Sequence, residues 1–460
     1  MANDFHLCQN PTVKDISAVT YPEAIQFLYS LRLFGAKFGL ENTFKLADLL
    51  GHPQEKLRFI HVAGTNGKGS TCAMLESIYR AAGLRVGLFT SPHLVSFRER
   101  IQVNRQLIPQ ADVVRVVGEL KPLFQQFPPG HHPTFFEVVT VMALKFFAEQ
   151  KCNLVIWETG LGGRLDATNI VTPLASVITN IQFDHQQWLG DTLAKIAAEK
   201  AGIIKPGVPV LTATDEPEAL AVIEKTAREK NAPLAIVAQT SRLCVFEQLQ
   251  KSCVSSTPVL PLIGEHQQIN ASLALATVEI LQSKIPVNQE AMRSGLSNVH
   301  WPGRLQLIQR PNGQKILLDG AHNAAGARVL AAALAKNFPA PAKTLILGVL
   351  NDKDWRTICA LLAPLASRVI TVSIASDRTA DANALAAACR AANPASQAAA
   401  CPSLGAALQQ TEARDFIVIA GSLYLVGEAL ELLGHPPAAG ERALNEWRAE
   451  PAATYANELT

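Results

Sequence analysis

The sequence predicts an α/β protein made of two units in tandem, each with a mainly parallel sheet between helices. Short apolar segments typical of buried strands alternate with helical segments along most of the chain, and this pattern indicates a parallel sheet covered by helices. A glycine-rich loop near residue 64 joins one such strand directly to a helix. The alternation breaks at Trp301-Pro302-Gly303 and then starts again, so we expect a hinge there.

The composition limits the classes of protein to which the chain can belong. It has 460 residues, 48% of them hydrophobic, and 41 basic against 39 acidic residues give a net charge of +2. The apolar content excludes a disordered chain, and the length predicts roughly two to three domains. The weak net charge argues against broad binding to nucleic acid or to an anionic membrane.

Signals for export or membrane insertion are missing from the pattern. The first residues show no basic stretch followed by an apolar core, as a secretory signal would. No uninterrupted apolar run reaches about 18 residues, the length that spans a bilayer. The eight cysteines are scattered without a Cys-x-x-Cys pair, which disfavours zinc and disulfide frameworks. We therefore expect a cytoplasmic protein with reduced thiols and no membrane contact.

The first unit is expected to cover residues 1–298. Its helix at 135–149 is apolar nearly all round and should be buried, and Asp191 is the expected N-cap of the helix at 191–201. The Ser-, Thr- and Pro-containing stretch 243–262 is expected to close the unit with small peripheral strands. The expected strands are 57–63, 85–90, 153–157, 175–179 and 208–212, and the expected helices are 70–82, 135–149, 191–201 and 270–281.

The second unit is expected to cover residues 299–435. Its strands are expected at 315–318, 344–348, 368–372 and 416–420, with helices between them. Residues 436–460 carry Pro, Ala and charge without a strong apolar face, so we expect a loosely attached tail.

The motif Gly64-Thr65-Asn66-Gly67-Lys68-Gly69-Ser70 predicts a phosphate site. It ends a strand and opens a helix, where glycine backbone N–H groups and the helix N-terminus attract phosphate oxygens. Lys68 would reach the β- and γ-phosphates. The motif departs from the usual G-x-x-x-x-G-K-[ST], because Val62 stands six positions before Lys68 and Gly69, not Ser or Thr, follows the lysine. The hydroxyl must therefore come from Ser70 or Thr71.

The base of the nucleotide is expected to be adenine. A guanine site normally adds Asn-Lys-x-Asp, whereas the nearest string here, Asn351-Asp352-Lys353-Asp354, has a different order. That string is equally well explained as the acidic start of a helix, with Asp352 or Asp354 as the N-cap.

Polar clusters follow the strands of the first unit. Glu158 comes directly after an apolar strand, Ser91 follows the second strand, and Asp184-His185 follow another. The carboxyl ends of parallel strands converge on one edge of a sheet, and Mg²⁺ prefers oxygen ligands there. Glu158 is the best metal candidate. The alternatives are a capping or ion-paired carboxylate for Glu158, a structural histidine for His185 and a turn residue for Ser91.

Three further places in the sequence suit a ligand or a helix cap. Lys200 lies late in a predicted helix, where a solvated cation that complements the helix dipole is the commoner reading. Asp319-Gly320-Ala321-His322-Asn323 follows a strand of the second unit, although Asn323 also suits an N-cap. Arg304, just past the hinge, would place a cation over phosphate bound between the units.

Taken in order from Phe38 to Tyr424, these motifs resemble the folylpolyglutamate synthases, many of which are also dihydrofolate synthases. The resemblance implies a P-loop ATPase domain like that of the Mur ligases, followed by a smaller Rossmann-like domain. The string Glu158 to Asn169 is the most specific part. The matching segments are Gly64 to Ser70, Ser91-Pro92-His93-Leu94, Glu158 to Asn169, Asp184-His185, Trp188-Leu189-Gly190, Glu199 to Gly202 and Asp319 to Asn323.

The resemblance implies an ATP-dependent ligation. ATP would phosphorylate a pterin carboxylate, and the amine of L-glutamate would attack the acyl phosphate. Mg²⁺ at two sites, ATP, a pteroate or folate and L-glutamate are the expected ligands, and a monomer without nucleic acid or membrane partners is expected. The sequence leaves open whether the enzyme makes dihydrofolate, extends polyglutamates or does both, and with which folate form or chain length.

Site roles follow from the resemblance residue by residue. The catalytic residues would be Lys68, His185 and Lys200, the last in carbamylated form. The metal ligands would be Ser91 and Glu158 for one Mg²⁺ and His185 for a second. ATP would contact Gly64, Thr65, Asn66, Gly67, Lys68, Gly69, Ser70, Asn270, Arg304, Asp319 and His322. The pterin site would use Phe38, Gly39, Leu40, Thr134, Phe135, Phe136, Glu137, Leu165, Asp166 and Ala167.

Some positions depart from the family or have another explanation. Ala324 stands where the family usually has Pro, and Gln186-Gln187 stand where Thr-Asp is common. Core packing explains Phe135 and Phe136 as well as a pterin contact does. A ligase acting on a peptidoglycan precursor is one alternative, which the Glu158 to Asn169 string disfavours. A P-loop regulatory protein that switches shape is another, and its nucleotide hydrolysis would ignore pteroate and glutamate.

Overall fold

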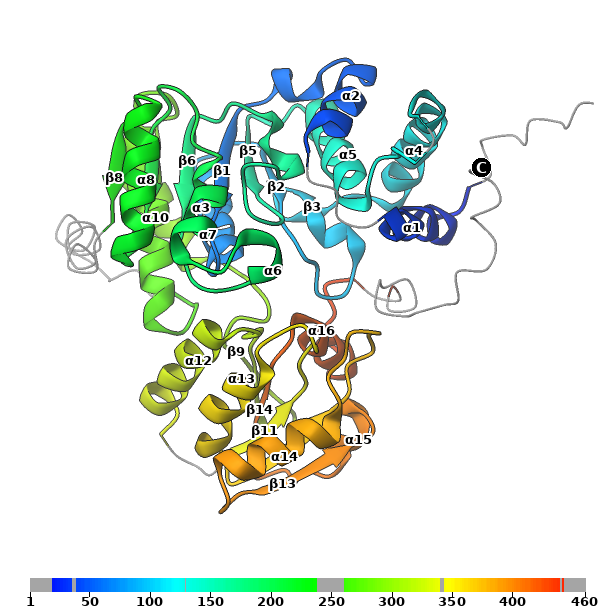
Figure 1. Ribbon diagram of the computed structural model, residues 1–460, viewed down its shortest axis with the longest axis vertical. Helices are drawn as coiled ribbons and strands as arrows, with labels where there is room; N and C mark the ends of the chain where they lie inside the picture. The colour runs from blue at the N-terminus through cyan, green and yellow to red at the C-terminus, as the bar shows by residue number, and fades with distance from the viewer. Residues whose placement is uncertain are drawn as a thin grey trace, which may run out of the picture.

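Two sheets, each flanked by helices, make up the protein (Figure 1). The computed structural model describes residues 19–34, 39–128, 130–237, 260–339, 343–438 and 441. An eight-stranded sheet lies in the first part of the chain and a six-stranded sheet in the second. Both carry antiparallel strands at an edge, so the predicted α/β class is confirmed with sheets that are mixed rather than wholly parallel.

The first sheet has the strand order β4-β3-β2-β5-β1-β6-β7-β8. The central strands β5, β1 and β6 pair in parallel. Every residue of β1 is buried, as its mainly apolar run, interrupted only by His61, predicts. The β3–β4 hairpin turns at Asn104 and Arg105, both with positive φ. The strands are β1 (Phe59–Ala63), β2 (Val86–Phe89), β3 (Ile101–Val103), β4 (Gln106–Leu107), β5 (Leu154–Glu158), β6 (Ala175–Ile178), β7 (Val210–Thr212) and β8 (Leu234–Ile236).

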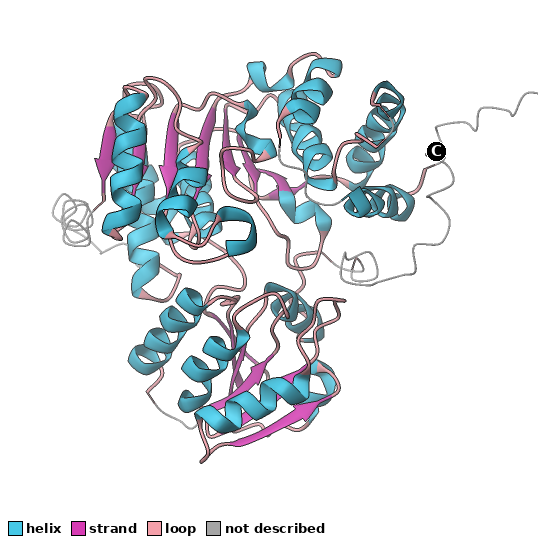
Figure 2. Ribbon diagram, viewed as in Figure 1, coloured by secondary structure: helices cyan, strands magenta, loops and turns pink. Residues whose placement is uncertain are grey.

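Helices bury both faces of this sheet (Figure 2). Phe59 of β1 packs in one apolar cluster with α1, α2, α4 and α5. Its neighbours Ile60 and Val62 pack in a second cluster with α3, α10 and α11. A third cluster joins α7 and α8 to β6 and β7. These helices are α1 (Tyr21–Ser30), α2 (Glu41–Leu49), α3 (Lys68–Ala81), α4 (Gln110–Leu120), α5 (Phe135–Glu149), α7 (Leu193–Ala201), α8 (Pro217–Glu229), α10 (Glu265–Ile280) and α11 (Gln289–Ser297).

The second sheet has the strand order β13-β12-β11-β14-β10-β9. Only β9 runs antiparallel to its neighbour among these described strands. Helices α12, α13 and α14 cover one face, and α15 and α16 cover the other. The elements are β9 (Gln306–Gln309), β10 (Lys315–Leu318), β11 (Lys343–Leu347), β12 (Arg368–Val372), β13 (Gln397–Cys401), β14 (Phe416–Ala420), α12 (Ala324–Asn337), α13 (Trp355–Leu362), α14 (Ala382–Ala392), α15 (Leu404–Gln409) and α16 (Leu423–Leu432).

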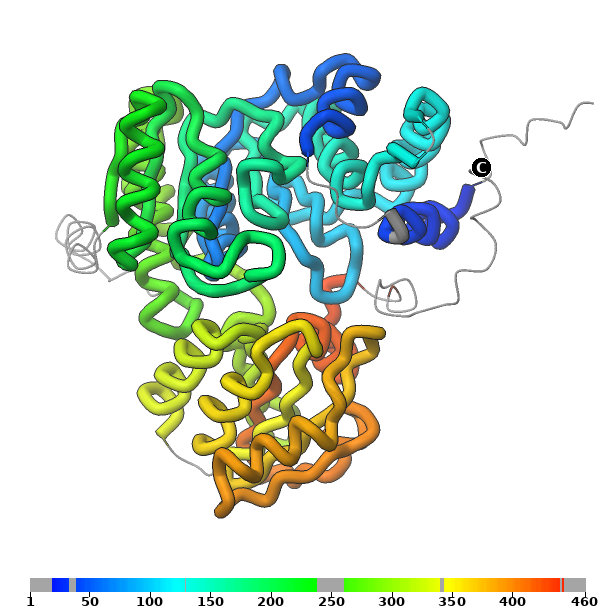
Figure 3. The backbone as a smooth tube through the Cα atoms, in the orientation of Figure 1, coloured from blue at the N-terminus to red at the C-terminus, as the bar shows by residue number. Residues whose placement is uncertain are grey.

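The predicted hinge residues pack against the phosphate loop. The chain leaves α11 and enters β9 through Trp301-Pro302-Gly303, and a Cβ on Gly69 would lie 2.8 Å from Cζ2 of Trp301. Arg105 stacks its guanidinium 5.4 Å from the Trp301 ring and donates to the backbone oxygen of His300. The path of the backbone between the two sheets can be followed in Figure 3.

Some local predictions are corrected by the structure. Asp191 is not the N-cap of α7, because Thr192 accepts the capping hydrogen bond from the N–H of Lys195. Asp191 instead pairs with the Lys195 ammonium at 2.8 Å. The strands expected at 243–262 fall mostly outside the described residues, as does most of the tail from 436. In the described part of the chain, no helix has both the length and the apolar character needed to cross a bilayer.

Candidate active site

The glycine-rich loop has the geometry of a phosphate cradle. Gly67 is the N-cap of α3 with φ of 83°, a conformation that glycine adopts without the Cβ penalty. The Lys68 ammonium folds back onto the loop and donates to the backbone oxygens of Gly64 and Thr65, both at 3.1 Å. In this arrangement the cation and the free N–H groups of α3 face the same cleft, which favours an anionic ligand.

Residues after β6 brace the loop from the side. The Thr179 hydroxyl donates to the backbone oxygen of Asn66 at 2.7 Å, and the Asn180 side-chain oxygen accepts from the Asn66 N–H at 2.8 Å. The Thr65 hydroxyl donates to the Gln182 backbone oxygen at 3.1 Å. The sequence interpretation missed these three bracing residues. Their polar character directly after a buried strand is the signal that would have indicated them.

Glu158 and Ser91 lie at the ends of adjacent strands, as the sequence predicts for them. The N–H of Ser91 donates to Oε2 of Glu158 at 2.9 Å, and Glu158 is 3% exposed. Burial raises the pKa of the Glu158 carboxyl to about 7, against the opposing charge of Lys68 and the Ser91 hydrogen bond. A carboxylate that is so poorly solvated gains most from a bound cation.

Lys200 is buried rather than solvated. It is 4% exposed, and its ammonium donates to the backbone oxygen of Gly64 at 2.8 Å. Burial, together with the like charge of Lys68, lowers the pKa of Lys200 to about 7. The interpretation as a surface cation that complements the helix dipole is therefore wrong, and the amine faces the phosphate loop.

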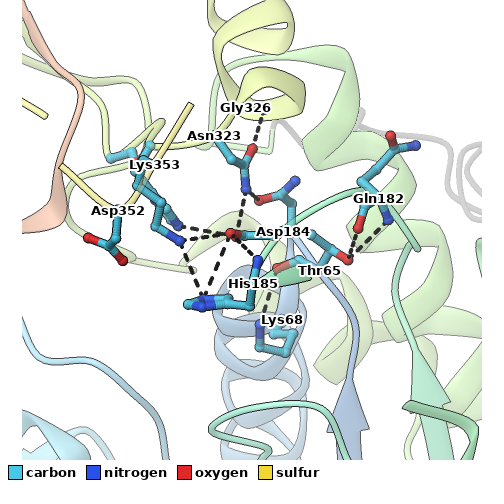
Figure 4. Close-up of polar contacts among 12 residues, drawn as sticks. Thr65, Lys68, Gln182, Asp184, His185, Asn323, Gly326, Asp352 and Lys353 are labelled. Carbon is cyan, nitrogen blue, oxygen red and sulfur yellow. Dashed lines mark hydrogen bonds and ion pairs between the residues drawn. The ribbon is translucent and has the colours of Figure 1, made fainter. Parts of the chain in front are cut away.

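Asp184 joins the two halves of the protein (Figure 4). Its Oδ1 accepts from the Lys353 ammonium at 2.7 Å, and its Oδ2 accepts from the Asn323 amide at 3.0 Å. The same amide donates to Oδ1 of Asn66 at 3.1 Å. Burial alone would raise the pKa of Asp184, but Lys353 and the neighbouring histidines hold it well below its usual range.

His185 lies beside this network. It has φ of 51°, and its Nε2 lies 3.4 Å from the Lys353 ammonium. The His185 side chain is 39% exposed, and its partial desolvation, together with the like charge of Lys353, lowers its pKa to about 4. The imidazole is therefore neutral at pH 7 and has a lone pair for a cation. The sequence indicates Lys353 only as part of a guanine motif or of the start of a helix. The helix start is confirmed, because Asp354 is the N-cap of α13 and accepts from the N–H of Thr357 at 3.2 Å.

The second domain brings a cation and a carboxylate to the cleft. Arg304 is half-buried beside Gly320, where a Cβ would collide with its guanidinium, and desolvation lowers the Arg304 pKa. Asp319 accepts from the N–H groups of Leu305 and Ala321, both at 2.9 Å. Its carboxylate therefore holds in place both Leu305, which follows the hinge, and the loop that carries Asp319 itself.

Two other expected nucleotide contacts lie close to loops of the cleft. A Cβ on Gly67 would lie 2.5 Å from Oδ1 of Asn270, so Asn270 packs directly on the phosphate loop. Nδ1 of His322 lies 2.7 Å from the backbone oxygen of Gly320. Asn323 is the N-cap of α12, as its sequence position suggested, and accepts from the N–H of Gly326 at 2.7 Å.

Residues expected to bind the pterin line the same cleft, and several also hold local structure. Thr134 and Glu137 form a capping box at the start of α5. Asp166 accepts from the N–H groups of Gly160 and Leu161 at 3.0 and 2.8 Å. Phe38 lies outside the described residues, and Leu40 precedes α2 without lining the cleft. The lining includes Gly39, Thr134, Phe135, Phe136, Glu137, Leu165, Asp166 and Ala167.

These groups surround one continuous cleft between the sheets. Its volume is about 1240 Å³, larger than the usual range of a site for one small ligand. The cleft joins the phosphate loop, Glu158 and Lys200 to Arg304 of the second domain. No cluster of three or more His, Cys, Asp or Glu side chains suited to a metal occurs among the described residues.

Comparison with known proteins agrees with this geometry. Residues 62–278 match the Mur ligase middle domain, and residues 303–423 match the glutamate ligase domain of the Mur ligases. The chain is 39% identical over 364 residues to the dihydrofolate synthase/folylpolyglutamate synthase of Bacillus subtilis, covering 76% of this chain and 84% of that protein. The chain belongs to this Mur ligase family.

Solved structures of family members have the same fold. The Mycobacterium tuberculosis folylpolyglutamate synthase complexed with ADP and AMPPCP is 33% identical, covers 90% of this chain and 100% of its own, and gives a TM-score of 0.79. Escherichia coli FolC in complex with DHPP and ADP is 30% identical, covers 91% of this chain and 98% of its own, and gives a TM-score of 0.78.

Gly69→Ala is expected to weaken nucleotide binding by roughly tenfold, because overpacking a closed site costs about 1–3 kcal/mol. The new methyl group would press on Trp301 at 2.8 Å and displace either the loop or the hinge. Titration with a non-hydrolysable ATP analogue measures the effect. Gly405→Ala in α15 is the matched control, since its nearest atom would lie 3.9 Å away. Equal affinities for the two variants would contradict the expected contact.

Proposed function

We propose that this chain is an ATP-dependent ligase that joins L-glutamate to the carboxylate of a pteroate or folate through an acyl phosphate. The observation that carries the proposal is the continuous cleft in which a phosphate loop, a buried acid and a half-buried cation of the second domain meet. The family relatives named dihydrofolate synthase and folylpolyglutamate synthase support the same substrates.

All three substrates are anions, which decides how they must be held. A net charge of +2 provides no strong overall field, so local charges have to hold them. Lys68 and the N-terminus of α3 bind the β- and γ-phosphates in this proposal, and Arg304 approaches them from the second domain. Gly64 to Ser70, Asn270, Asp319 and His322 complete the ATP site.

The residues present fit Mg²⁺ at the phosphates. Glu158 is buried with a pKa raised to about 7, and bound Mg²⁺ would neutralise charge on the phosphates beside it. Ser91 and Glu158 would hold one ion, with phosphate oxygens and water as its other ligands. His185, neutral because partial desolvation lowers its pKa to about 4, would hold a second.

Lys200 is proposed to carry a carbamate. The neutral amine attacks CO₂, a bond forms between Nζ and carbon, and the proton leaves to solvent. A pKa lowered to about 7 makes the neutral amine available at physiological pH. The product is a carboxylate beside the phosphate loop, which adds negative charge where the proposed metal ions bind.

The ligation then depends on placement of three reactants. The pterin carboxylate attacks the γ-phosphorus of ATP, ADP leaves, and the glutamate amine attacks the acyl phosphate and displaces phosphate. Lys68 and Arg304 stabilise the charge on the transferring phosphoryl group. The pterin is proposed to lie along Gly39, Thr134 to Glu137 and Leu165 to Ala167. Holding the three reactants in this arrangement lowers the barrier of the reaction through their orientation rather than through covalent bonds to the protein.

The two-sheet arrangement supports residues 1–298 and 299–435 as the ligase and C-terminal domains. Residues 436–460 remain the expected loosely attached tail, although Glu441 within it is buried. The enzyme is proposed to act as a cytoplasmic monomer. The described cysteines are free and buried, which agrees with a reducing compartment.

Phosphate release tests this function. With ATP, dihydropteroate and glutamate together we expect steady release, and omission of either organic substrate should reduce it by at least about tenfold. Tetrahydrofolate in place of dihydropteroate tells the two activities apart. Release that ignores both organic substrates would support the regulatory P-loop alternative and exclude the ligase.

A further inference from the structure

Glu441, beyond the last helix of the second domain, lies buried against the first domain. It is 3% exposed. Tyr21 of α1 donates its hydroxyl to Oε2 at 3.0 Å, Gln110 of α4 donates its amide to Oε1 at 3.0 Å, and the Ser96 hydroxyl also donates to Oε2. Arg98 forms an ion pair with Oε1 at 2.6 Å. One carboxylate thus gathers side chains from three segments of the other domain.

This contact is an attachment between the domains that lies apart from the hinge. The covalent hinge at residues 301–303 is one other attachment, and the contacts of Asp184 with Asn323 and Lys353 are another. Attachments at separate places restrict the directions in which the two domains can move relative to one another. A single hinge would leave more directions open.

The segment that Glu441 holds is the loop that also carries Ser91. Leu94 and Val95 of this loop pack in one apolar cluster with Leu425 and Val426 of α16. A Cβ on Gly427 would collide with the backbone oxygen of Leu94. In Figure 3 the red end of the described chain lies beside this light-blue loop. The second domain therefore grips the loop through α16 and through Glu441.

This loop is internally rigid, so a displacement at one end of it moves the other end as well. The Glu99 carboxylate accepts hydrogen bonds from the N–H groups of Leu94, Val95 and Ser96 at 3.0, 2.8 and 2.6 Å. Ser91 in turn donates its N–H to Glu158. A displacement at Ser96 or Arg98 therefore reaches Ser91 through a hydrogen-bonded turn rather than through a slack segment.

We propose that Glu441 is a positioning residue that fastens the C-terminal segment to the Ser91 loop, so that the affinity of the site for Mg-ATP depends on this strap. The proposal rests on the proposed function only for the role of Ser91 at the metal. We define the strap as Glu441 and its four partners. These partners are Tyr21, Ser96, Arg98 and Gln110, and their contacts with Glu441 do not depend on the proposed function.

Glu441→Ala tests the strap in the full-length enzyme. We expect the KM for Mg-ATP to rise by about tenfold, with kcat and the KM for glutamate changed less than about twofold. Hydrogen exchange at Leu94, Val95 and Ser96 should become faster in the nucleotide-free protein. Glu441→Gln keeps an acceptor for Tyr21 and Ser96 but loses the charge opposite Arg98, so we expect an intermediate KM.

Two further variants separate the strap from general damage. Tyr21→Phe removes one hydroxyl and should raise the KM for Mg-ATP by less than Glu441→Ala does. Combined with Glu441→Ala, it should cause no further rise in this KM. Glu412→Ala is the matched control, since its carboxylate pairs with Arg414 on the surface. An unchanged KM for Mg-ATP with unchanged exchange in the loop would overturn the proposal.

The outcomes also distinguish the strap from the function. If wild-type turnover ignores pteroate and glutamate, the ligase proposal fails, while hydrogen exchange and ATP-analogue binding still report on the strap. If Glu441→Ala does not fold, the KM values of Tyr21→Phe and Glu441→Gln for Mg-ATP decide whether the proposal holds. Equal loss of kcat and of affinity for every substrate would mean that Glu441 only stabilises the fold, and would also overturn the proposal.

Discussion

Lys200→Ala is expected to reduce ligation by about 100-fold or more, the scale seen when one preorganised charge is removed from a catalytic site. The wild-type amine is buried beside Gly64 at 2.8 Å, and its proposed carbamate lies where the phosphates and metal ions meet. Alanine removes the only atom of this side chain that can take up CO₂. Steady-state turnover with dihydropteroate and glutamate measures the loss.

Intact-protein mass spectrometry at neutral pH, in bicarbonate, should show the added mass of one CO₂ on the wild type and not on Lys200→Ala. Lys195→Ala is the control, because Lys195 lies on the same helix and pairs with Asp191 at the surface. Full activity of Lys200→Ala would remove the carbamate proposal. A wild type without the added mass, combined with an inactive variant, would leave Lys200 as an ammonium that binds phosphate.

The pH dependence of this modification has a definite sign. Burial lowers the pKa of Lys200 to about 7 from its usual 10.5. Below about pH 7 the amine is protonated and cannot attack CO₂, so the modified fraction should fall as the pH falls. Between about 7 and 10.5 the unfolded chain binds more protons at this site than the folded protein, so the lysine's contribution to stability rises with pH.

The strands and the phosphate loop could be predicted because their signals are local. Short, mainly apolar runs followed by glycine or an acid mark β1, β5 and β10, although His61 lies within β1 and Lys315 begins β10. These strands fix where Glu158 and Asp319 lie. The edge strands β4 and β13 carry little apolar pattern. Their pairing comes from tertiary neighbours, which sequence periodicity does not report.

The burial and pairing of the charged residues in the site were also harder to predict, because they too depend on tertiary contacts. The helix pattern around Lys200 fits an exposed C-terminal cation, and only the packing of α7 on the phosphate loop buries it. Asp184 and Lys353 are 169 residues apart and pair across the cleft. Glu441 meets Tyr21 from a distance of 420 residues. Contacts of this kind depend on how the two domains dock, which no local pattern encodes.

Glu158→Gln is expected to move activity and stability in opposite directions. Activity should fall by about 100–1,000-fold, because a neutral amide supplies neither the charge for Mg²⁺ nor its usual ligand type. The nucleotide-free protein should become more stable above pH 7. Glutamine has nearly the same shape as Glu158 and can still accept from the N–H of Ser91, so the substitution removes a buried charge without leaving a cavity.

The stability gain should itself depend on pH, and this identifies its cause. The Glu158 carboxyl has a pKa raised from 4.5 to about 7, so between these values the folded protein binds more protons than the unfolded chain. Ionisation therefore costs the folded state roughly 1–3 kcal/mol at pH 8 and almost nothing near pH 4. Thermal unfolding of Glu158→Gln and wild type without ligand should differ at pH 8 and converge at low pH.

Glu229→Gln, on the surface of α8, is the control for this comparison and should match the wild type at both pH values. Added Mg-ATP should reverse the order at pH 8, because only the wild-type carboxylate gains from the cation and binding to the folded state adds to its stability. A variant less stable than wild type at pH 8 without ligand would mean that the carboxylate is needed for folding. In that case the acid of the cleft is held by its positively charged neighbours Lys68 and Arg304 rather than kept for a metal ion.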